Sequence, residues 1–145
     1  MSAITGIGHV AIKVADINRA LRFYADAFGF NELMRLERDD GSLWLVYLRI
    51  TDTQFLEVFP EARGPQAPDE DANGLNHICL EVDDIEAVIA GIEAAGVELF
   101  RPLTTGADGN RQAWVKDPDG NRIELMQMNP DGMQARAIAA LRAGA

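Results

Sequence analysis

The sequence predicts an α+β fold built from two tandem βαβββ modules. Three observations predict it: the chain repeats itself, each half opens with an alternating strand and a helix, and each half continues with three strand-like segments. GIGHVAIKVADINRA at residues 6–20 and GLNHICLEVDDIEAV at residues 74–88 share Gly, His, Asp and Ile at matching columns. The match continues to the end of each half, where QFLEVFP at 54–60 corresponds to NRIELMQ at 121–127.

The repeat sets the expected domain boundaries. Residues 1–59 form the first module and residues 74–128 the second. Between them PEARGPQAPDEDAN, residues 60–73, contains three prolines and a run of acids, which is typical of a solvated linker. Residues 129–145 form a C-terminal tail with a short helix.

Each module is expected to begin with a strand that has one apolar face. HVAIKV at residues 9–14 alternates strictly, with three β-branched residues on one face and His9 and Lys13 on the other. HICLEV at residues 77–82 repeats this pattern, with His77 opposite the aliphatic side chains. Because the apolar face must cover a helix, both histidines are expected on the free face of their sheet.

A helix follows each first strand. Asp16 is suited to cap free N–H groups at the start of the first helix, and Gly29 is suited to end it. Gly96 ends the equivalent helix, DIEAVIAGIEAAG. GMQARAIAALRA at residues 132–143 predicts the terminal helix, which is expected to serve packing or a dimer contact.

Three further strands complete each module. The turn KDPDGN joins the last two strands of the second module, because Pro118 presets φ and Gly120 is free to take a positive φ. The expected strands cover residues 31–38, 43–50 and 53–59, then 98–103, 111–116 and 121–128.

Composition excludes several classes of function. The chain has 145 residues, a formal charge of −10 and a pI of about 4.5, so its surface repels phosphate backbones and no nucleic-acid partner is expected. No apolar run approaches the ~20 residues that cross a bilayer, and MSAITGIGH lacks the features of a signal peptide, so no membrane partner is expected. Cys79 is the single cysteine; it is expected as a small buried residue and fits a reducing cytoplasm.

Two histidines and two glutamates occupy equivalent positions in the repeat. A lone histidine on such a strand is most simply a structural residue, and a lone glutamate is most simply solvent-exposed. However, His9 and His77 are the only histidines, and Glu57 and Glu124 each interrupt an apolar strand, FLEVF or RIELM. A carboxylate in such a strand is costly unless it is paired, protonated or bound to a cation. The four residues together therefore predict a metal site.

The ligand types narrow the choice of metal. Two imidazoles and two carboxylates suit Zn²⁺, Ni²⁺, Co²⁺, Mn²⁺ or Fe²⁺. A structural zinc site is more often built from cysteines, and this chain has one. The site is therefore interpreted as catalytic, with open positions for water or for two vicinal oxygens of a substrate.

With these residues in view, the chain resembles the vicinal oxygen chelate superfamily, in its glyoxalase I-like branch. The resemblance spans about residues 6–128 and is carried by GHVAIKVADINRALRFY, LNHICLEVDDI and DPDGNRIEL. It implies paired βαβββ modules whose curved mixed sheets enclose a metal-binding cavity. The ligand order of glyoxalase I, His, Glu, His, Glu, falls on His9, Glu57, His77 and Glu124.

The resemblance also implies a function: a lactoylglutathione lyase that isomerises the hemithioacetal of methylglyoxal and glutathione through a metal-stabilised ene-diolate. Glu124 is expected as the main base, with Glu57 sharing the role. One divalent metal ion per site is expected, Ni²⁺, Zn²⁺ or Co²⁺ first and Mn²⁺ or Fe²⁺ next. A homodimer is implied as well, in which His9 and Glu57 meet the partner subunit's His77 and the partner subunit's Glu124.

The sequence departs from the short bacterial glyoxalases at substrate positions. Lys13 replaces their usual arginine and can hold a carboxylate only as a point charge. Glu61 replaces their usual asparagine. Metal binding is therefore better supported than use of glutathione. Trp44, Tyr47 and Trp114 either line the cavity or pack in the core.

Other functions of this superfamily compete with the lyase. An extradiol dioxygenase uses two histidines and one glutamate, so Glu57 argues against it. Methylmalonyl-CoA epimerases usually carry glutamine at that position. Resistance-type proteins bind small molecules without chemistry and lack the ligands. The metal, the substrate, and whether one chain or two supply the ligands stay open.

Overall fold

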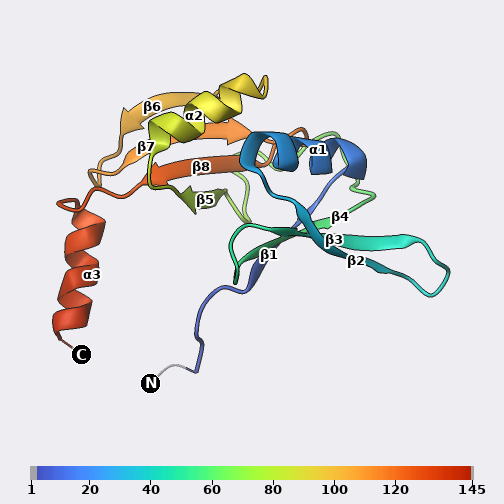
Figure 1. The fold of residues 1–145 in the computed structure, drawn as a ribbon, viewed down its shortest axis with the longest axis horizontal. Coiled ribbons are helices and arrows are strands. Elements are labelled where there is room, and N and C mark those ends of the chain that lie inside the picture. The colour runs from blue at the N-terminus through green and yellow to red at the C-terminus, as the bar shows by residue number, and fades with distance from the viewer. Residues whose placement is uncertain (1–2, 145) are drawn as a thin grey trace. The chain divides into compact units, whose positions relative to one another are not determined.

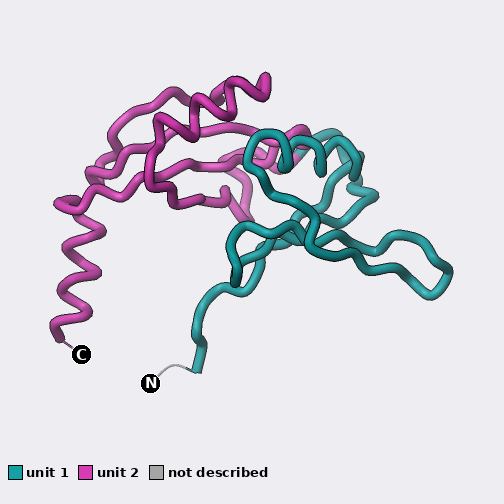
Figure 2. Tube along the Cα trace, viewed as in Figure 1, with its two compact units in different colours: residues 1–66 teal, residues 67–145 magenta. Residues whose placement is uncertain are grey.

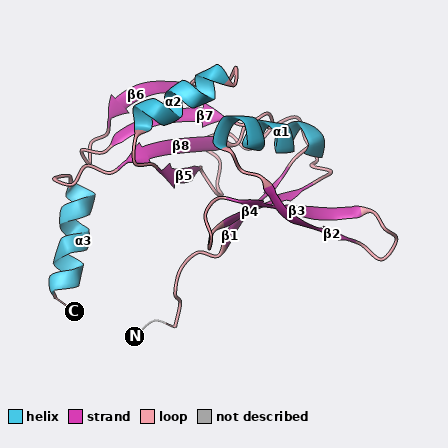
Figure 3. Cartoon of the chain, in the orientation of Figure 1, coloured by secondary structure: helices cyan, strands magenta, loops and turns pink. Residues whose placement is uncertain are grey.

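The protein, studied as a computed structural model, is described for residues 3–144 and follows one element order twice (Figure 1). The first half contains β1 (His9–Lys13), α1 (Ile17–Phe28), β2 (Glu32–Glu37), β3 (Leu43–Arg49) and β4 (Phe55–Phe59). The second contains β5 (Ile78–Glu81), α2 (Ile85–Ala94), β6 (Arg101–Thr105), β7 (Arg111–Lys116) and β8 (Arg122–Gln127), followed by α3 (Met133–Ala143) (Figure 3).

The two halves share one sheet topology. Each forms a four-stranded sheet, in the orders β1-β4-β3-β2 and β5-β8-β7-β6. β1 runs parallel to β4, and β5 parallel to β8, while the remaining neighbours are antiparallel. The predicted α+β fold with two βαβββ modules and mixed sheets is confirmed.

The chain divides into two compact units, Met1–Gln66 and Ala67–Ala145 (Figure 2). The division falls inside the segment 60–73 that was expected to be a solvated linker. From Ala67 onward this segment belongs to the second unit, where the Ala67 N–H donates to the Asp119 carbonyl at 2.7 Å.

The helix ends follow the capping residues in the sequence. The Asp16 carboxylate accepts from the Arg19 N–H at 3.0 Å, and Asp84 accepts from Ala87 at the same distance. Gly29 ends α1 with φ +68°, a left-handed conformation that favours glycine because it has no Cβ. No helix among residues 3–144 combines the length and apolar content of a membrane span.

Strand alternation separates a core face from a polar face in both sheets. Apart from Leu45, the buried aliphatic residues of the strands lie at alternate positions, which leaves His9, Lys13 and Glu57 on the other face of the first sheet. This confirms the predicted placement of His9 and Lys13. The aliphatic core residues of the strands are Ile12, Leu45, Val46, Leu48, Leu56 and Val58 in unit 1, and Ala113, Val115, Ile123 and Leu125 in unit 2.

Two expectations about side-chain burial need revision. Cys79 is exposed rather than buried, because it lies on the polar face of β5. Trp44 is 46% exposed, so it is not a core residue.

Helix α3 has no buried residue in the described chain. It is attached to unit 2 where Asn110 donates to the Gln134 side chain at 2.8 Å.

Candidate metal-binding site

A row of side chains crosses the polar face of the unit 1 sheet. The strand register places Ala11 of β1, Glu57 of β4, Tyr47 of β3 and Met34 of β2 opposite one another. Side chains that oppose one another across strands point to the same face. Glu57 is therefore near the middle of the sheet, and His9 lies one alternation away on the same face.

His9 and Glu57 are brought together. Their Nε2 and Oε2 atoms lie 3.5 Å apart, and the glutamate side chain is only 9% exposed, against 50% for the histidine. The ring of Tyr47 approaches the His9 ring edge-on, with 6.4 Å between the centroids. This pair is what the sequence predicted for the first half of the site.

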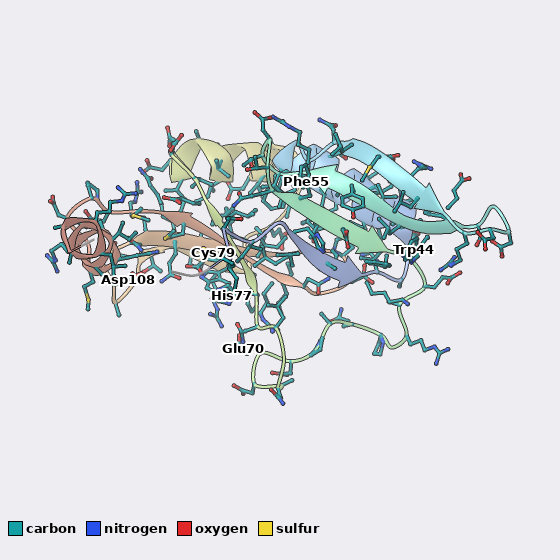
Figure 4. All side chains as sticks on the ribbon, turned by 90° about the horizontal axis from the view of Figure 1, so that it is seen from below. Trp44, Phe55, Glu70, His77, Cys79 and Asp108 are labelled. Carbon is teal, nitrogen blue, oxygen red and sulfur yellow. The ribbon has the colours of Figure 1, made fainter. Side chains whose placement is uncertain are left out.

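The unit 2 sheet repeats the row with different neighbours. Its register places Cys79 of β5, Glu124 of β8, Trp114 of β7 and Arg101 of β6 opposite one another. His77 directly precedes β5, and Figure 4 labels it beside Cys79. Cysteine, tryptophan and arginine thus stand where unit 1 has alanine, tyrosine and methionine.

His77 and Glu124 form the second pair. Nε2 of His77 lies 3.1 Å from Oε2 of Glu124, and the side chains are 32% and 16% exposed. The Trp114 ring packs against the His77 ring at 66°, with 4.7 Å between the centroids. Trp114 and Tyr47 therefore flank the two histidines, whereas Trp44 lies where the register of β3 with β2 shifts.

Both pairs have the spacing that a shared metal ion requires. An imidazole nitrogen and a carboxylate oxygen at about 2.0–2.2 Å from one cation stand about 2.9–3.5 Å apart for ligand angles of roughly 90–110°. The observed separations of 3.1 and 3.5 Å fall in this range. Neutral imidazole and carboxylate are also the donors that Zn²⁺, Ni²⁺ and Co²⁺ accept. The residues therefore fit such an ion.

Each unit supplies two of the four predicted ligands. Within residues 3–144, no three His, Cys, Asp or Glu side chains cluster closely enough to hold a metal ion. Two protein ligands are fewer than a tight site for these metals normally uses.

The two glutamates have different hydrogen-bond donors. The Tyr47 hydroxyl donates to Glu57; this bond, together with burial and the carboxylate charge, raises the pKa of Tyr47. Burial first, and then the nearby Glu124 carboxylate, raise the pKa of the Cys79 thiol to about 12. The residue as a whole is exposed, so it is the sulfur atom that is shielded. The thiol therefore stays protonated near neutral pH and faces Glu124.

Sequence reasoning missed one residue at this site. Asn76 directly precedes His77, and its Oδ1 lies 2.9 Å from Nδ1 of the ring. The only signal for it was a difference between the repeats, because the equivalent residue before His9 is Gly8.

Positive charge lies on the polar faces of both units. Lys13 is exposed on β1, two alternations along the strand from His9. In unit 2 the Lys116 ammonium lies 3.8 Å from the centre of the Phe100 ring, and the Arg101 guanidinium lies 5.2 Å from the centre of the Trp114 ring. These cations are candidates for an anionic group of a substrate.

The chain is similar to known proteins over most of its length. The family model described as Glyoxalase/Bleomycin resistance protein/Dioxygenase superfamily matches residues 6–125. A lactoylglutathione lyase of Pseudomonas aeruginosa is 27% identical, covering 88% of this chain and 85% of that protein. A probable lactoylglutathione lyase of Vibrio cholerae is 32% identical, covering 82% of this chain and 88% of that protein.

Solved structures share the fold. A glyoxalase family protein from Enterococcus faecalis superposes with a TM-score of 0.73 at 31% identity, covering 84% of this chain and 97% of that chain. A lactoylglutathione lyase from Agrobacterium tumefaciens has a TM-score of 0.66 at 23% identity, covering 87% of this chain and 96% of that chain, and it supports the fold alone.

Proposed function

Because the chain belongs to the Glyoxalase/Bleomycin resistance protein/Dioxygenase superfamily, we propose that it is a metal-dependent lyase of the lactoylglutathione lyase type. The observation that carries this proposal is the pair of equivalent His–Glu contacts, His9 with Glu57 and His77 with Glu124. A binding protein without chemistry has no need for two such pairs at matching positions. The relatives named lactoylglutathione lyase point the same way.

In this proposal the four side chains hold one divalent ion, Ni²⁺, Zn²⁺ or Co²⁺ first and Mn²⁺ or Fe²⁺ next. When bound, the ion supplies Lewis-acid stabilisation of the negative charge that develops on two adjacent substrate oxygens. The Glu124 carboxylate takes the proton from the substrate C–H and returns it to the neighbouring carbon, which moves the carbonyl by one position. Glu57 shares this role.

The direct test is activity with the hemithioacetal of methylglyoxal and glutathione after metal removal and reconstitution. We expect turnover to appear with at least one of Ni²⁺, Co²⁺, Zn²⁺ or Mn²⁺ and to vanish with a chelator. Metal binding without this turnover would favour another metal-dependent enzyme of the superfamily, an epimerase or a dioxygenase. Failure to bind any divalent metal would favour a resistance-type binding protein and would end the proposal.

A homodimer follows if the second copy completes the site. Since each unit contributes two ligands, the shared-site version joins His9 and Glu57 to the partner subunit's His77 and the partner subunit's Glu124. We expect sedimentation at micromolar concentration to give twice the monomer mass, in the presence of metal. A monomer that still binds metal tightly would contradict the shared site and would leave a site completed within one chain.

Lys13 is proposed to hold an anionic end of the substrate. We expect Lys13→Ala to raise KM on the order of 10-fold while kcat changes little, since the lost contact serves ground state and transition state alike. Lys116→Ala is the matched control, because it removes the same charge from the sheet of the other unit. A larger KM effect from Lys116→Ala than from Lys13→Ala would place anion recognition on unit 2.

A further inference from the structure

In the segment that precedes β5, the side-chain amide of Asn76 lies against the ring of His77. Oδ1 of Asn76 lies 2.9 Å from Nδ1 of that ring. The Nδ2 group of the same amide donates to the Glu70 carbonyl at 2.7 Å. A carbonyl oxygen can only accept, so the amide must turn its nitrogen toward Glu70. Its oxygen therefore faces His77.

This orientation gives one nitrogen of the ring a fixed acceptor. The Asn76 oxygen can only accept a hydrogen bond, so Nδ1 is the donor whenever this bond is made. Nε2 faces a second acceptor, because it lies 3.1 Å from Oε2 of Glu124. Without metal the two acceptors compete for the one proton of a neutral ring, whereas a cation held by Nε2 and Glu124 leaves that proton on Nδ1.

The segment that carries Asn76 is itself held in place. Arg122 is 7% exposed, and its Nε donates to the Asn76 carbonyl at 2.9 Å while Nη1 donates to the Pro68 carbonyl at 3.0 Å. Arg101 bonds the Glu70 carboxylate at 2.7 Å. Both the backbone of Asn76 and the residue that orients its amide are therefore fixed to the unit 2 sheet, and Figure 4 shows Glu70 on this segment near His77.

We infer that Asn76 is a positioning residue that locks His77 with Nδ1 protonated and Nε2 directed at the metal, and that the equivalent position beside His9 offers no such lock. The inference rests on the proposed function for its metal, and it has a readout besides activity, the Nδ1–H proton of each histidine. A hydrogen bond from the second ring nitrogen is the usual way in which a protein fixes a metal-binding histidine. At the repeat-equivalent position Gly8 has no side chain to offer. The two histidines are thus unequal ligands: Asn76 gives His77 an acceptor for Nδ1–H, and Gly8 gives His9 none.

The first measurement is the exchange of each Nδ1–H with solvent in Zn²⁺-loaded protein. Long-range ¹H–¹⁵N correlation spectra assign the ring protons. We expect the Nδ1–H of His77 to exchange slowly and that of His9 to exchange fast. In Asn76→Ala, the Nδ1–H of His77 should exchange as fast as that of His9. A His77 proton that already exchanges as fast as that of His9 in the wild type, or whose exchange Asn76→Ala leaves unchanged, would overturn the inference.

The second measurement is metal affinity by competition with a chromogenic chelator, using Zn²⁺ as the probe. Asn76→Ala should weaken binding by about 10–100-fold, the usual effect of losing the hydrogen-bond partner of a ligand histidine. Asn76→Asp keeps an acceptor for Nδ1 and should restore most of the affinity. Equal weakening in both variants would mean that Asn76 only shapes the segment, and this would contradict a positioning role.

Gly8→Asn is the matched control next to the other histidine. A Cβ added at Gly8 would meet no other atom within 4 Å, and φ there is outside the left-handed range, so the side chain is tolerated. This variant should keep or increase the affinity for Zn²⁺. A loss as large as that of Asn76→Ala would show that any change beside a ligand disturbs the metal, and would overturn the inference. If wild-type protein binds no Zn²⁺, the proposed function fails; if it binds Zn²⁺ and Asn76→Ala binds it as tightly, the inference alone fails.

Discussion

His77→Ala is expected to lower the affinity for divalent metal by about 10²–10³-fold while the protein stays folded. Four ligands together bind zinc with a free energy of roughly 10–16 kcal/mol, and this fold-change corresponds to an equal share of that free energy for one ligand. The fold should persist because the His77 side chain is 32% exposed and belongs to the polar face, not to the aliphatic core. His9→Ala should behave in the same way, since its side chain is 50% exposed.

Metal content after dialysis and thermal unfolding followed by circular dichroism test this prediction together. Lys13→Ala is the matched control, because it changes a residue on the same face of the same strand as His9 and removes no ligand. We expect this control to retain its metal. If both histidine variants keep the wild-type metal affinity, the metal is bound elsewhere and the 2-His-2-Glu site is wrong.

The elements of the fold were predictable because the repeat and the alternation are strong local signals. Prediction was weakest at β6, which was expected at 98–103 and lies at Arg101–Thr105. The apolar run VELF favoured an earlier start. In the structure the Phe100 N–H already bonds Trp114, but the register shifts between Arg101 and Thr104, and Pro102 between them cannot donate to a ladder. Such irregular pairing depends on the partner strand and leaves little trace in the local pattern.

From the sequence, the candidate site could be predicted only at positions that are equivalent in the two halves. Equivalent positions identified His9, Glu57, His77 and Glu124, and the structure places them as two His–Glu contacts. The hydrogen-bond donors to the glutamates could not be predicted from the repeat, because it is the register of β3 with β4 that brings Tyr47 opposite Glu57. Alternation assigns a residue to a face but does not say which residue stands opposite it. Asn76 was missed for another reason: its counterpart is Gly8, so it differs between the halves, and a search for matching positions does not select it.

The strand register also distinguishes the surroundings of the two glutamates, which occupy equivalent positions in the sequence repeat. Glu57 faces the Tyr47 hydroxyl, and hydrogen bonding to this carboxylate is the main cause of the raised pKa of Tyr47. In unit 2 the position of Tyr47 is taken by Trp114, whose indole N–H donates to the Gln112 side chain at 3.0 Å. Trp114 therefore cannot give Glu124 the hydrogen bond that Tyr47 gives Glu57.

Glu124→Gln is accordingly expected to lower turnover by at least ~10²-fold, the usual scale for loss of a general base, with the metal still bound. Glutamine keeps the size and one oxygen ligand but cannot take a proton. The Cys79 thiol beside Glu124 is a weak donor, and the Glu124 side chain is 16% exposed against 9% for Glu57. Glu124 is thus the freer and more accessible base.

Glu57→Gln should cost less turnover than Glu124→Gln, because the Glu57 carboxylate faces the Tyr47 hydroxyl and is the more buried of the two. Tyr47→Phe removes the hydroxyl and so frees Glu57. When Tyr47→Phe is combined with Glu57→Gln and, separately, with Glu124→Gln, the difference in turnover between the two glutamine variants should become smaller. Turnover and metal content are measured for all of these proteins, and each rate is compared at equal metal occupancy. A Glu124→Gln protein that keeps its metal and near-wild-type turnover would show that Glu124 is not the base. An equal loss in Glu124→Gln and Glu57→Gln would show instead that the hydrogen bond from Tyr47 does not restrain Glu57, since that bond is the clearest difference between the two carboxylates.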